Sequence, residues 1–243
     1  MTAQTRPAFY ALAPGGWRDY VTLLHPPYTL WHLSFVAIGA ALAPHLALGR
    51  LLVALAAFFL AVGIGAHALD ELNGRPLGTQ ISKGMLAGLA AASVGAAVAI
   101  GIWASLAYTF WLAPLVAAGG FIVCAYNLEL FGGRFHGNVW FALAWGSFPL
   151  LAAYLAVAER LTAEALLGAA FAGLLSLAQR HLSTQVRTVR RRVVAVSGTL
   201  VLRDGRREAV TVRTLTETPE AALRALTLAV IALAASLLVL RLT

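Results

Sequence analysis

Apolar residues occur in seven long runs along the chain, separated by shorter polar segments. Crossing about 30 Å of hydrocarbon as an α-helix takes roughly twenty predominantly apolar residues. Runs close to that length cover residues 28–46, 51–69, 85–105, 109–126, 138–157, 163–182 and 221–241. The pattern predicts an all-α, polytopic transmembrane bundle of about seven helices, forming a single transmembrane domain over residues 1–243.

The composition favours a membrane location. Hydrophobic residues make up 60% of the 243 positions and charged residues 12%, whereas soluble domains carry roughly 25% charged residues. The single cysteine, Cys124, lies within an apolar run, which excludes a disulfide framework and a cysteine-based metal site. The segment before the first run lacks a short apolar core followed by a cleavage site, so we expect no removable signal peptide.

Positive charge is distributed unevenly between the two sides of the predicted bundle. With the N-terminus in the cytoplasm, fifteen of the eighteen Lys and Arg residues fall on cytoplasmic segments, and only Arg50, Arg160 and Arg241 fall on the other side. Because cytoplasmic loops are enriched in Lys and Arg, we predict an integral membrane protein with a cytoplasmic N-terminus and its C-terminus on the opposite side. The net charge of +8 then indicates attraction to anionic membrane lipid, and we expect no nucleic-acid partner.

The segment between the sixth and seventh runs has the pattern of a β-hairpin. Residues 199–202 and 208–212 favour strands, and Asp204-Gly205 between them favours a turn. We therefore predict a small cytoplasmic hairpin within residues 193–213, which covers a site or docks a partner.

The start of the last helix has a capping signal of its own. Thr218 is a good N-cap residue and Pro219 suits the first helical position. We expect the last helix to begin there.

The residues capable of chemistry lie mainly in the predicted cytoplasmic segments. Asp70 and Glu71 are adjacent carboxylates at the end of the second run. Mg²⁺ binds through one or two carboxylates together with substrate phosphates, so both are candidate metal ligands and catalytic residues; solvated residues at a helix end are the alternative. The candidate substrate-binding residues are Arg75, Lys83, Tyr126, Asn127, Arg134, Arg180, His181, Gln185 and Arg187. For Arg180 and His181 the alternative is an ordinary position at the membrane interface.

A short motif follows Asp70. An R-P-L turn at residues 75–77 precedes a Q-I-S tripeptide at 80–82. This segment resembles the region after the second helix in the UbiA superfamily of intramembrane prenyltransferases, over about residues 20–190. Further matches are Tyr126, Asn127, Arg134 and the G-S-F-P tetrapeptide at 146–149.

The resemblance implies a helical bundle whose site opens to the cytoplasm, where Mg²⁺ ions held by two acidic motifs bind an isoprenyl diphosphate. This chain differs from the family at the second motif, where Arg180, His181 and Arg187 stand and acidic residues are absent. The first motif is shortened to Asp70 and Glu71, and the family has nine helices. We therefore expect a bound diphosphate to depend on arginine more than on Mg²⁺.

Three functions remain open from the sequence. The first is a divergent UbiA-type prenyltransferase that acts on an isoprenyl diphosphate and a lipophilic acceptor at the cytoplasmic face. The second is a non-catalytic protein that binds an isoprenoid, quinone or pigment, or that forms a homo-oligomer or a subunit of a larger membrane complex. The third, a transporter or channel, is disfavoured because charged residues are scarce in mid-span. For the first two, we expect Asp70, Arg75, Arg134 and Arg180 to converge on one cytoplasmic pocket.

Overall fold

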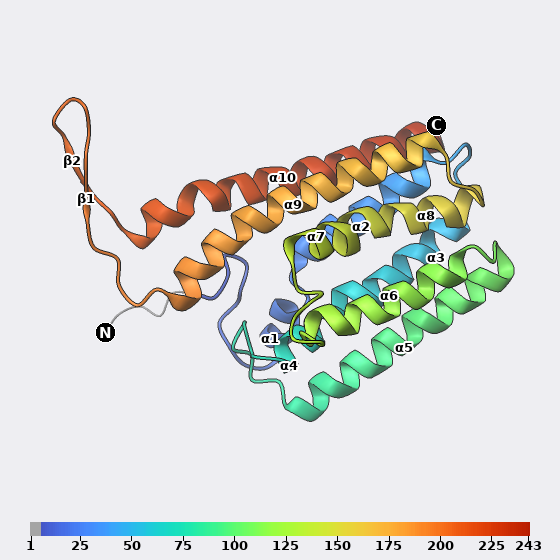
Figure 1. Ribbon diagram of the computed structural model, residues 1–243, viewed down its shortest axis with the longest axis horizontal. Coiled ribbons are helices and arrows are strands. Elements are labelled where there is room, and N and C mark those ends of the chain that lie inside the picture. The colour runs from blue at the N-terminus through green and yellow to red at the C-terminus, as the bar shows by residue number, and fades with distance from the viewer. Residues whose placement is uncertain (1–5) are drawn as a thin grey trace.

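The computed structural model describes residues 6–243, which form a helical bundle with one small sheet (Figure 1). Its elements are α1 (Trp17–Leu23), α2 (Pro26–Leu42), α3 (Leu48–Phe58), η1 (Phe59–Ala66), α4 (His67–Leu72), α5 (Lys83–Ala107), α6 (Leu112–Asn127), α7 (Asn138–Phe141), η2 (Ala142–Ser147), α8 (Phe148–Ala158), α9 (Ala163–Arg192), β1 (Thr199–Val201), β2 (Arg207–Ala209) and α10 (Val212–Leu242).

Within residues 6–243, five helices are long and apolar enough to cross a membrane, which indicates a membrane protein. They are Leu48–Leu72, Lys83–Ala107, Asn138–Ala158, Ala163–Arg192 and Val212–Leu242. The two remaining apolar runs correspond to the shorter helices α2 and α6, of 17 and 16 residues. The prediction of a mostly helical membrane protein is thus confirmed.

Two of the long helices contain π-helical segments. Helix Leu48–Leu72 runs from α3 through the π-helical η1 into α4, and Asn138–Ala158 runs from α7 through η2 into α8. Single π-turns within α-helices occur frequently at functional sites. Here η1 leads directly to His67 and Asp70, and η2 contains Trp145.

The centre of the bundle is the contact of α2 with α8 and α10. Trp31 and Phe35 of α2 pack with Tyr154 of α8 and Val230 of α10 in one buried cluster. A Cβ on Gly39 would overlap the carbonyl group of Leu150. Glycine at this position therefore lets the backbones of α2 and α8 approach closely, as small residues do between membrane helices.

A second close approach joins η2 to α9. A Cβ on Gly146 would overlap the carbonyl oxygen of Ala172. Beside it, the Ser147 hydroxyl donates to the Ala169 carbonyl at 2.8 Å. This packing places the second half of α9 beside Trp145, in the region described below as the polar pocket.

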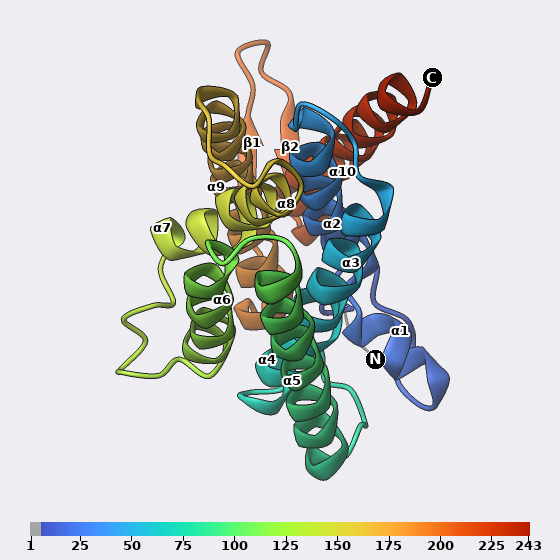
Figure 2. The ribbon, with the colours of Figure 1, turned by 90° about the vertical axis from the view of Figure 1, so that its right-hand side faces the viewer.

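The two ends of the bundle differ. At one end the connections between helices are short, and the C-terminus lies there; α1, α4 and the hairpin lie toward the other end (Figure 1). Figure 2, turned by 90°, shows α5 and α6 on one side of the bundle and α10 on another. The polar side chains described below gather at the end of α4.

The predicted hairpin is present as a two-stranded sheet. β1 and β2 pair antiparallel, with Val201 opposite Arg207. In the turn, the Leu202 amide donates to the Arg206 carbonyl at 2.8 Å, and Gly205 has φ of +84°. The hairpin projects away from the bundle (Figure 1).

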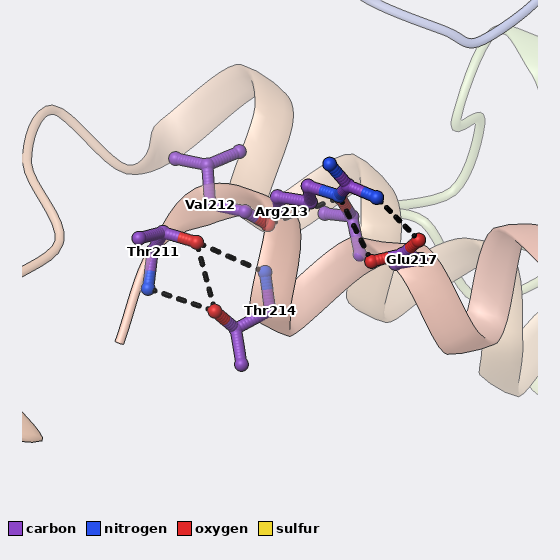
Figure 3. Close-up of polar contacts among 6 residues, drawn as sticks. Thr211, Val212, Arg213, Thr214 and Glu217 are labelled. Atoms are coloured by element: carbon purple, nitrogen blue, oxygen red, sulfur yellow. Dashed lines mark hydrogen bonds and ion pairs between the residues drawn. The ribbon is translucent and has the colours of Figure 1, made fainter. Parts of the chain in front are cut away.

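The prediction for the start of the last helix is wrong. Helix α10 begins seven residues before Pro219, at Val212, with Thr211 as N-cap. The Thr211 hydroxyl accepts from the Thr214 amide at 3.1 Å, while the Thr214 hydroxyl accepts from the Thr211 amide (Figure 3). This reciprocal capping box satisfies two free amide groups, and Pro219 lies inside the helix.

Candidate functional site

A polar pocket lies where α4 and α6 end. It is lined by the beginning of α2, the last residues of α4 and α6, Trp145 of η2, the second half of α9, and residues 7–10 before α1. Aromatic and imidazole rings make up much of its wall. The sequence motifs that suggested a site are thus partly assembled by the fold at one end of the bundle.

Three arginines of α9 form one wall of the pocket. Arg180, Arg187 and Arg191 all line it, and their spacing of seven and four residues places them on one face of a helix. Within residues 6–243 none of these three forms a salt bridge, whereas the neighbouring Arg190 pairs with Glu220. Asp70 is the only carboxylate of the described residues that lines this pocket, so cations exceed anions by three to one.

Arg180 is held against aromatic rings. Its guanidinium carbon lies 5.1 Å from the centre of the Phe141 ring and 5.8 Å from that of Tyr126. Tyr126 in turn stacks on His136, with ring centres 4.4 Å apart. Cation–π contacts of this kind orient an arginine while leaving its N–H groups free to bind oxygen atoms.

Asp70 and Glu71 have different surroundings. Asp70 lines the pocket, but Glu71 is fully buried beneath the loop that follows α4. Its Oε2 accepts from the Leu77 amide at 2.9 Å, and its Oε1 accepts from the amide and hydroxyl of Thr79 at 2.8 and 2.9 Å. Glu71 therefore fixes the loop backbone.

Arg75 supports the same loop from within it. Arg75 has φ of +49°. Its guanidinium donates to the Thr79 carbonyl at 2.7 Å and to the Ile81 carbonyl at 2.9 Å. The R-P-L motif thus forms a turn stabilised by its own cation and by a buried carboxylate.

These contacts do not fit a magnesium site built from two adjacent carboxylates. Both oxygens of Glu71 face loop donors, which leaves Asp70 as the one carboxylate directed to the pocket. In the described residues no group of three or more His, Cys, Asp or Glu side chains is arranged to hold a metal ion. The donor set instead suits direct binding of an anion by arginine.

The structure brings together some of the predicted substrate-binding residues and not others. Four line the pocket beside Asp70, namely Tyr126, Asn127, Arg180 and Arg187. The others do not line it: Arg75 lies in the loop, and Lys83, Arg134, His181 and Gln185 are exposed. Gln185 reaches α10, where its amide donates to the Leu215 carbonyl at 3.4 Å. The expected convergence of Asp70 with Arg180 is found, and that with Arg75 and Arg134 is not.

Sequence reasoning missed the most constrained residue of the pocket, His25. It is 8% exposed and has φ of +45°, which is unusual for a residue other than glycine. The Tyr10 hydroxyl and His25 Nδ1 are 2.6 Å apart, and the His25 ring stacks on His67 with centres 4.1 Å apart. Within residues 6–243 its Nε2 is buried with no hydrogen-bond partner.

The state of His25 follows from these contacts. Burial, and then the neighbouring His67, lower the pKa of His25 well below its ordinary value, and burial raises the pKa of Tyr10 well above its own. Tyr10 therefore keeps its proton, and His25 is neutral. When the Tyr10 hydroxyl is the donor to Nδ1, Nε2 carries the hydrogen of the ring. His25 lines the pocket, and its place before Pro26 at the start of the first apolar run was the available sequence signal.

An apolar cavity adjoins the polar pocket. It lies among α3, η1, α5, α6 and α8, has a volume of about 120 Å³, and opens in part to the surroundings. Its wall consists almost entirely of Ala, Val, Gly, Leu and Phe. Trp145 lines both the cavity and the polar pocket, so the two compartments are neighbours with one shared wall.

The fold and this pair of compartments define a class of protein: a helical membrane protein with a cation-rich polar pocket next to an apolar cavity. Comparisons with protein-family models, with curated proteins and with solved structures find no match to this chain. Its assignment to a function therefore depends on the site.

Proposed function

We propose that this protein is a divergent prenyltransferase of the UbiA type, which binds an isoprenyl diphosphate and transfers the isoprenyl group to a lipophilic acceptor. The observation that supports it best is the pairing of an arginine-lined pocket with an apolar cavity across Trp145. An isoprenyl diphosphate has the same two parts, a multiply charged head and an apolar chain. The resemblance of residues 70–82 to the family motif is the second support.

In this proposal the head group binds to the arginine wall. Arg180, Arg187 and Arg191 donate to diphosphate oxygens, and His25 Nε2–H and the Tyr126 hydroxyl add neutral contacts. Charge-assisted hydrogen bonds are roughly twice as strong as neutral ones. The buried polar atoms of His25 and Tyr126 that now lack partners would thereby gain them.

Transfer then requires the leaving group to be stabilised. The bond between C1 of the allylic chain and the diphosphate oxygen breaks, and the electron pair leaves with the diphosphate. A nucleophilic atom of the acceptor bonds to C1, and the proton that the acceptor loses passes to the carboxylate of Asp70, which lines the pocket. Fixed cations directed at the departing anion provide the electrostatic stabilisation that such a step needs, and no step passes through a metal ion.

The topology of the proposal has seven spans, with α2 and α6 crossing beside the five longer helices. The N-terminus and the polar pocket face the cytoplasm, and the C-terminus lies on the opposite side. The supporting feature is the charge asymmetry, because cytoplasmic loops collect arginine. Helices shorter than twenty residues span by local bilayer thinning.

One observation favours the alternative, a non-catalytic protein that binds an isoprenoid, quinone or pigment, or that serves in a homo-oligomer or larger complex. Glu71 is withdrawn into the loop, which leaves Asp70 as the one acidic group at the head of the ligand. Binding of an amphiphilic anion needs no acidic group, whereas transfer depends on Asp70 alone to take up the proton of the acceptor.

A transfer assay on the purified protein in lipid nanodiscs separates the two functions. A mixture of prenyl diphosphates is offered with lipophilic acceptors, with and without Mg²⁺, to the wild type and to Asp70→Asn. Product formation that Asp70→Asn reduces by orders of magnitude supports the transferase. Tight binding of prenyl diphosphate with no product from any acceptor supports the binding protein. Absence of both activity and binding contradicts the proposal.

A further inference from the structure

At the end opposite the polar pocket, the apolar cavity is lined by Arg50, Tyr108 and Ala156. Arg50 at the beginning of α3 lines this end, and its Nη1 donates to the Ala156 carbonyl at 2.9 Å and to Glu159 Oε1 at 2.7 Å. Its guanidinium carbon lies 4.6 Å from the centre of the Tyr108 ring. One arginine thus ties α3, α5 and α8 together at this end.

The position of Arg50 limits how far an apolar chain can extend. A hydrocarbon that continued past it would displace the guanidinium from its carbonyl and carboxylate partners, or surround the charge with hydrocarbon. Leaving a charged group without partners in an apolar environment is costly. The cluster around Arg50 therefore acts as a floor of the cavity.

The depth of the cavity follows from the helices that line it. Along α3 and η1 the lining runs from Arg50 to Val62, and along α6 from Leu112 to Val123. At about 1.5 Å per residue these stretches are roughly 16–18 Å long. The cavity is therefore shorter than the roughly 30 Å of hydrocarbon that a membrane provides.

An isoprene unit adds four bonds to the length of a chain. In an extended peptide, the three backbone bonds of one residue span roughly 3.3–3.6 Å. Four bonds of similar geometry, as in one isoprene unit, therefore span about 4–5 Å. Three units then reach about 14 Å, and four fill the cavity from Trp145 to the floor. A chain of eight or more units would have to leave sideways between helices into lipid.

We propose that the cavity selects short isoprenyl chains, of three units and at most four, with the Arg50 cluster as the floor that sets the limit. This inference rests on the proposed binding of an isoprenyl diphosphate in the polar pocket. It narrows the substrate class from any prenyl diphosphate to farnesyl- and geranylgeranyl-length chains.

Direct binding to the purified protein in nanodiscs tests the limit. The probes are inorganic diphosphate and prenyl diphosphates of two, three, four and eight units, each titrated by competition against one labelled three-unit ligand. Burial of each methylene contributes about 0.8 kcal/mol, so affinity should rise at least tenfold from two to three units. It should gain little from three to four and nothing from four to eight.

Variants within the cavity sharpen the test. Ala97 and Ala104 of α5 are buried and line the cavity, with Ala104 nearer the floor. Ala104→Phe should lower the affinity for four units below that for three, and Ala97→Phe should make two units bind as well as three. The matched control is Ala96→Phe, because Ala96 is exposed on the same helix. Ala104→Leu serves where the phenylalanine variant does not fold.

The outcomes distinguish the inference from the proposed function. If inorganic diphosphate and every prenyl diphosphate fail to bind the wild type, the proposed function is contradicted. If these ligands bind but the affinity keeps rising up to eight units, the proposed function stands and the chain-length limit is contradicted. The limit is also contradicted if affinity depends on chain length in the same way in Ala97→Phe and Ala96→Phe. A maximum at three to four units that Ala97→Phe shortens supports the inference.

Discussion

Arginines lie at both ends of the apolar cavity, but they are used differently. At the end opposite the polar pocket, Arg50 is occupied by two carbonyl groups, a carboxylate and an aromatic ring. At the polar pocket, Arg180, Arg187 and Arg191 have few partners among the described residues, and none of these is a carboxylate in a salt bridge. The Arg50 guanidinium is thus used within the protein, whereas the half-buried arginines of the pocket keep N–H groups for the ligand that we propose.

Removing two arginines of the wall should have the largest effect. Each hydrogen bond to a charged group contributes about 1.5–3 kcal/mol, so the double variant Arg187→Ala with Arg191→Ala should bind inorganic diphosphate and prenyl diphosphate at least 100-fold more weakly. Equilibrium titration in nanodiscs measures this loss. The control is the double variant Arg192→Ala with Arg203→Ala, which removes two exposed charges. Equal losses in both would mean that only net charge matters.

Removal of the Arg50 side chain should lower the stability of the protein and leave its affinity for the head group nearly unchanged. Arg50→Ala removes hydrogen bonds that tie α3 to α8, at a cost of about 2–3 kcal/mol. Thermal unfolding in detergent should show a lowered midpoint, while the affinity for inorganic diphosphate stays within about twofold of wild type. Arg160→Ala, an exposed position in the neighbouring loop, is the control. A loss of diphosphate binding without a loss of stability would remove the distinction between the two ends.

His25 should contribute less to binding than the arginine wall does. His25→Phe keeps an aromatic ring against His67 but removes Nε2, which has no hydrogen-bond partner within residues 6–243. A single hydrogen bond to an anion corresponds to about a tenfold loss of affinity. His45→Phe, at an exposed position, is the control. Unchanged affinity in His25→Phe would show that Nε2 does not contact the ligand.

The lowered pKa of His25 also predicts that the stability of the folded protein depends on pH. Because burial lowers its pKa, the folded protein keeps it neutral, while the unfolded chain takes up a proton below about pH 6.5. Stability should therefore fall as the pH drops below that value. His25→Phe should show a smaller decrease between pH 7.5 and pH 5 than the wild type, as measured by thermal unfolding.

The hairpin should have the smallest effect on ligand binding. Within residues 6–243 it contributes nothing to the wall of the polar pocket, whereas residues 7–10 do. The sequence-based expectation left open whether the hairpin covers a site or docks a partner; within residues 6–243 the hairpin does not line this pocket. Deletion of residues 196–210 should leave helix insertion and diphosphate affinity unchanged. A tenfold loss of affinity would show that the hairpin closes over the pocket in the bound state.

The sequence by itself determined the apolar helices, the hairpin and the charge asymmetry. Helices and turns of this kind depend on local patterns: the length of an apolar run, or a turn dipeptide between β-prone stretches. The predicted start of α10 was wrong for two reasons. Thr211 and Thr214 form a capping box that outweighs the weaker capping signal at Thr218. A helix of a membrane protein also tolerates a proline such as Pro219 in its interior.

Only the tertiary structure decided which polar residues share a site. Asp70 and Glu71 are neighbours in sequence, yet successive helical side chains point about 100° apart, so one faces the pocket and the other the loop. The pairing of His25 with Tyr10 and His67, the contact of Arg50 with Ala156, and the exposure of Arg134 all depend on how segments far apart in the chain are placed. A local sequence pattern does not determine these contacts, because they depend on how closely separate helices approach one another, as at Gly39 and Gly146.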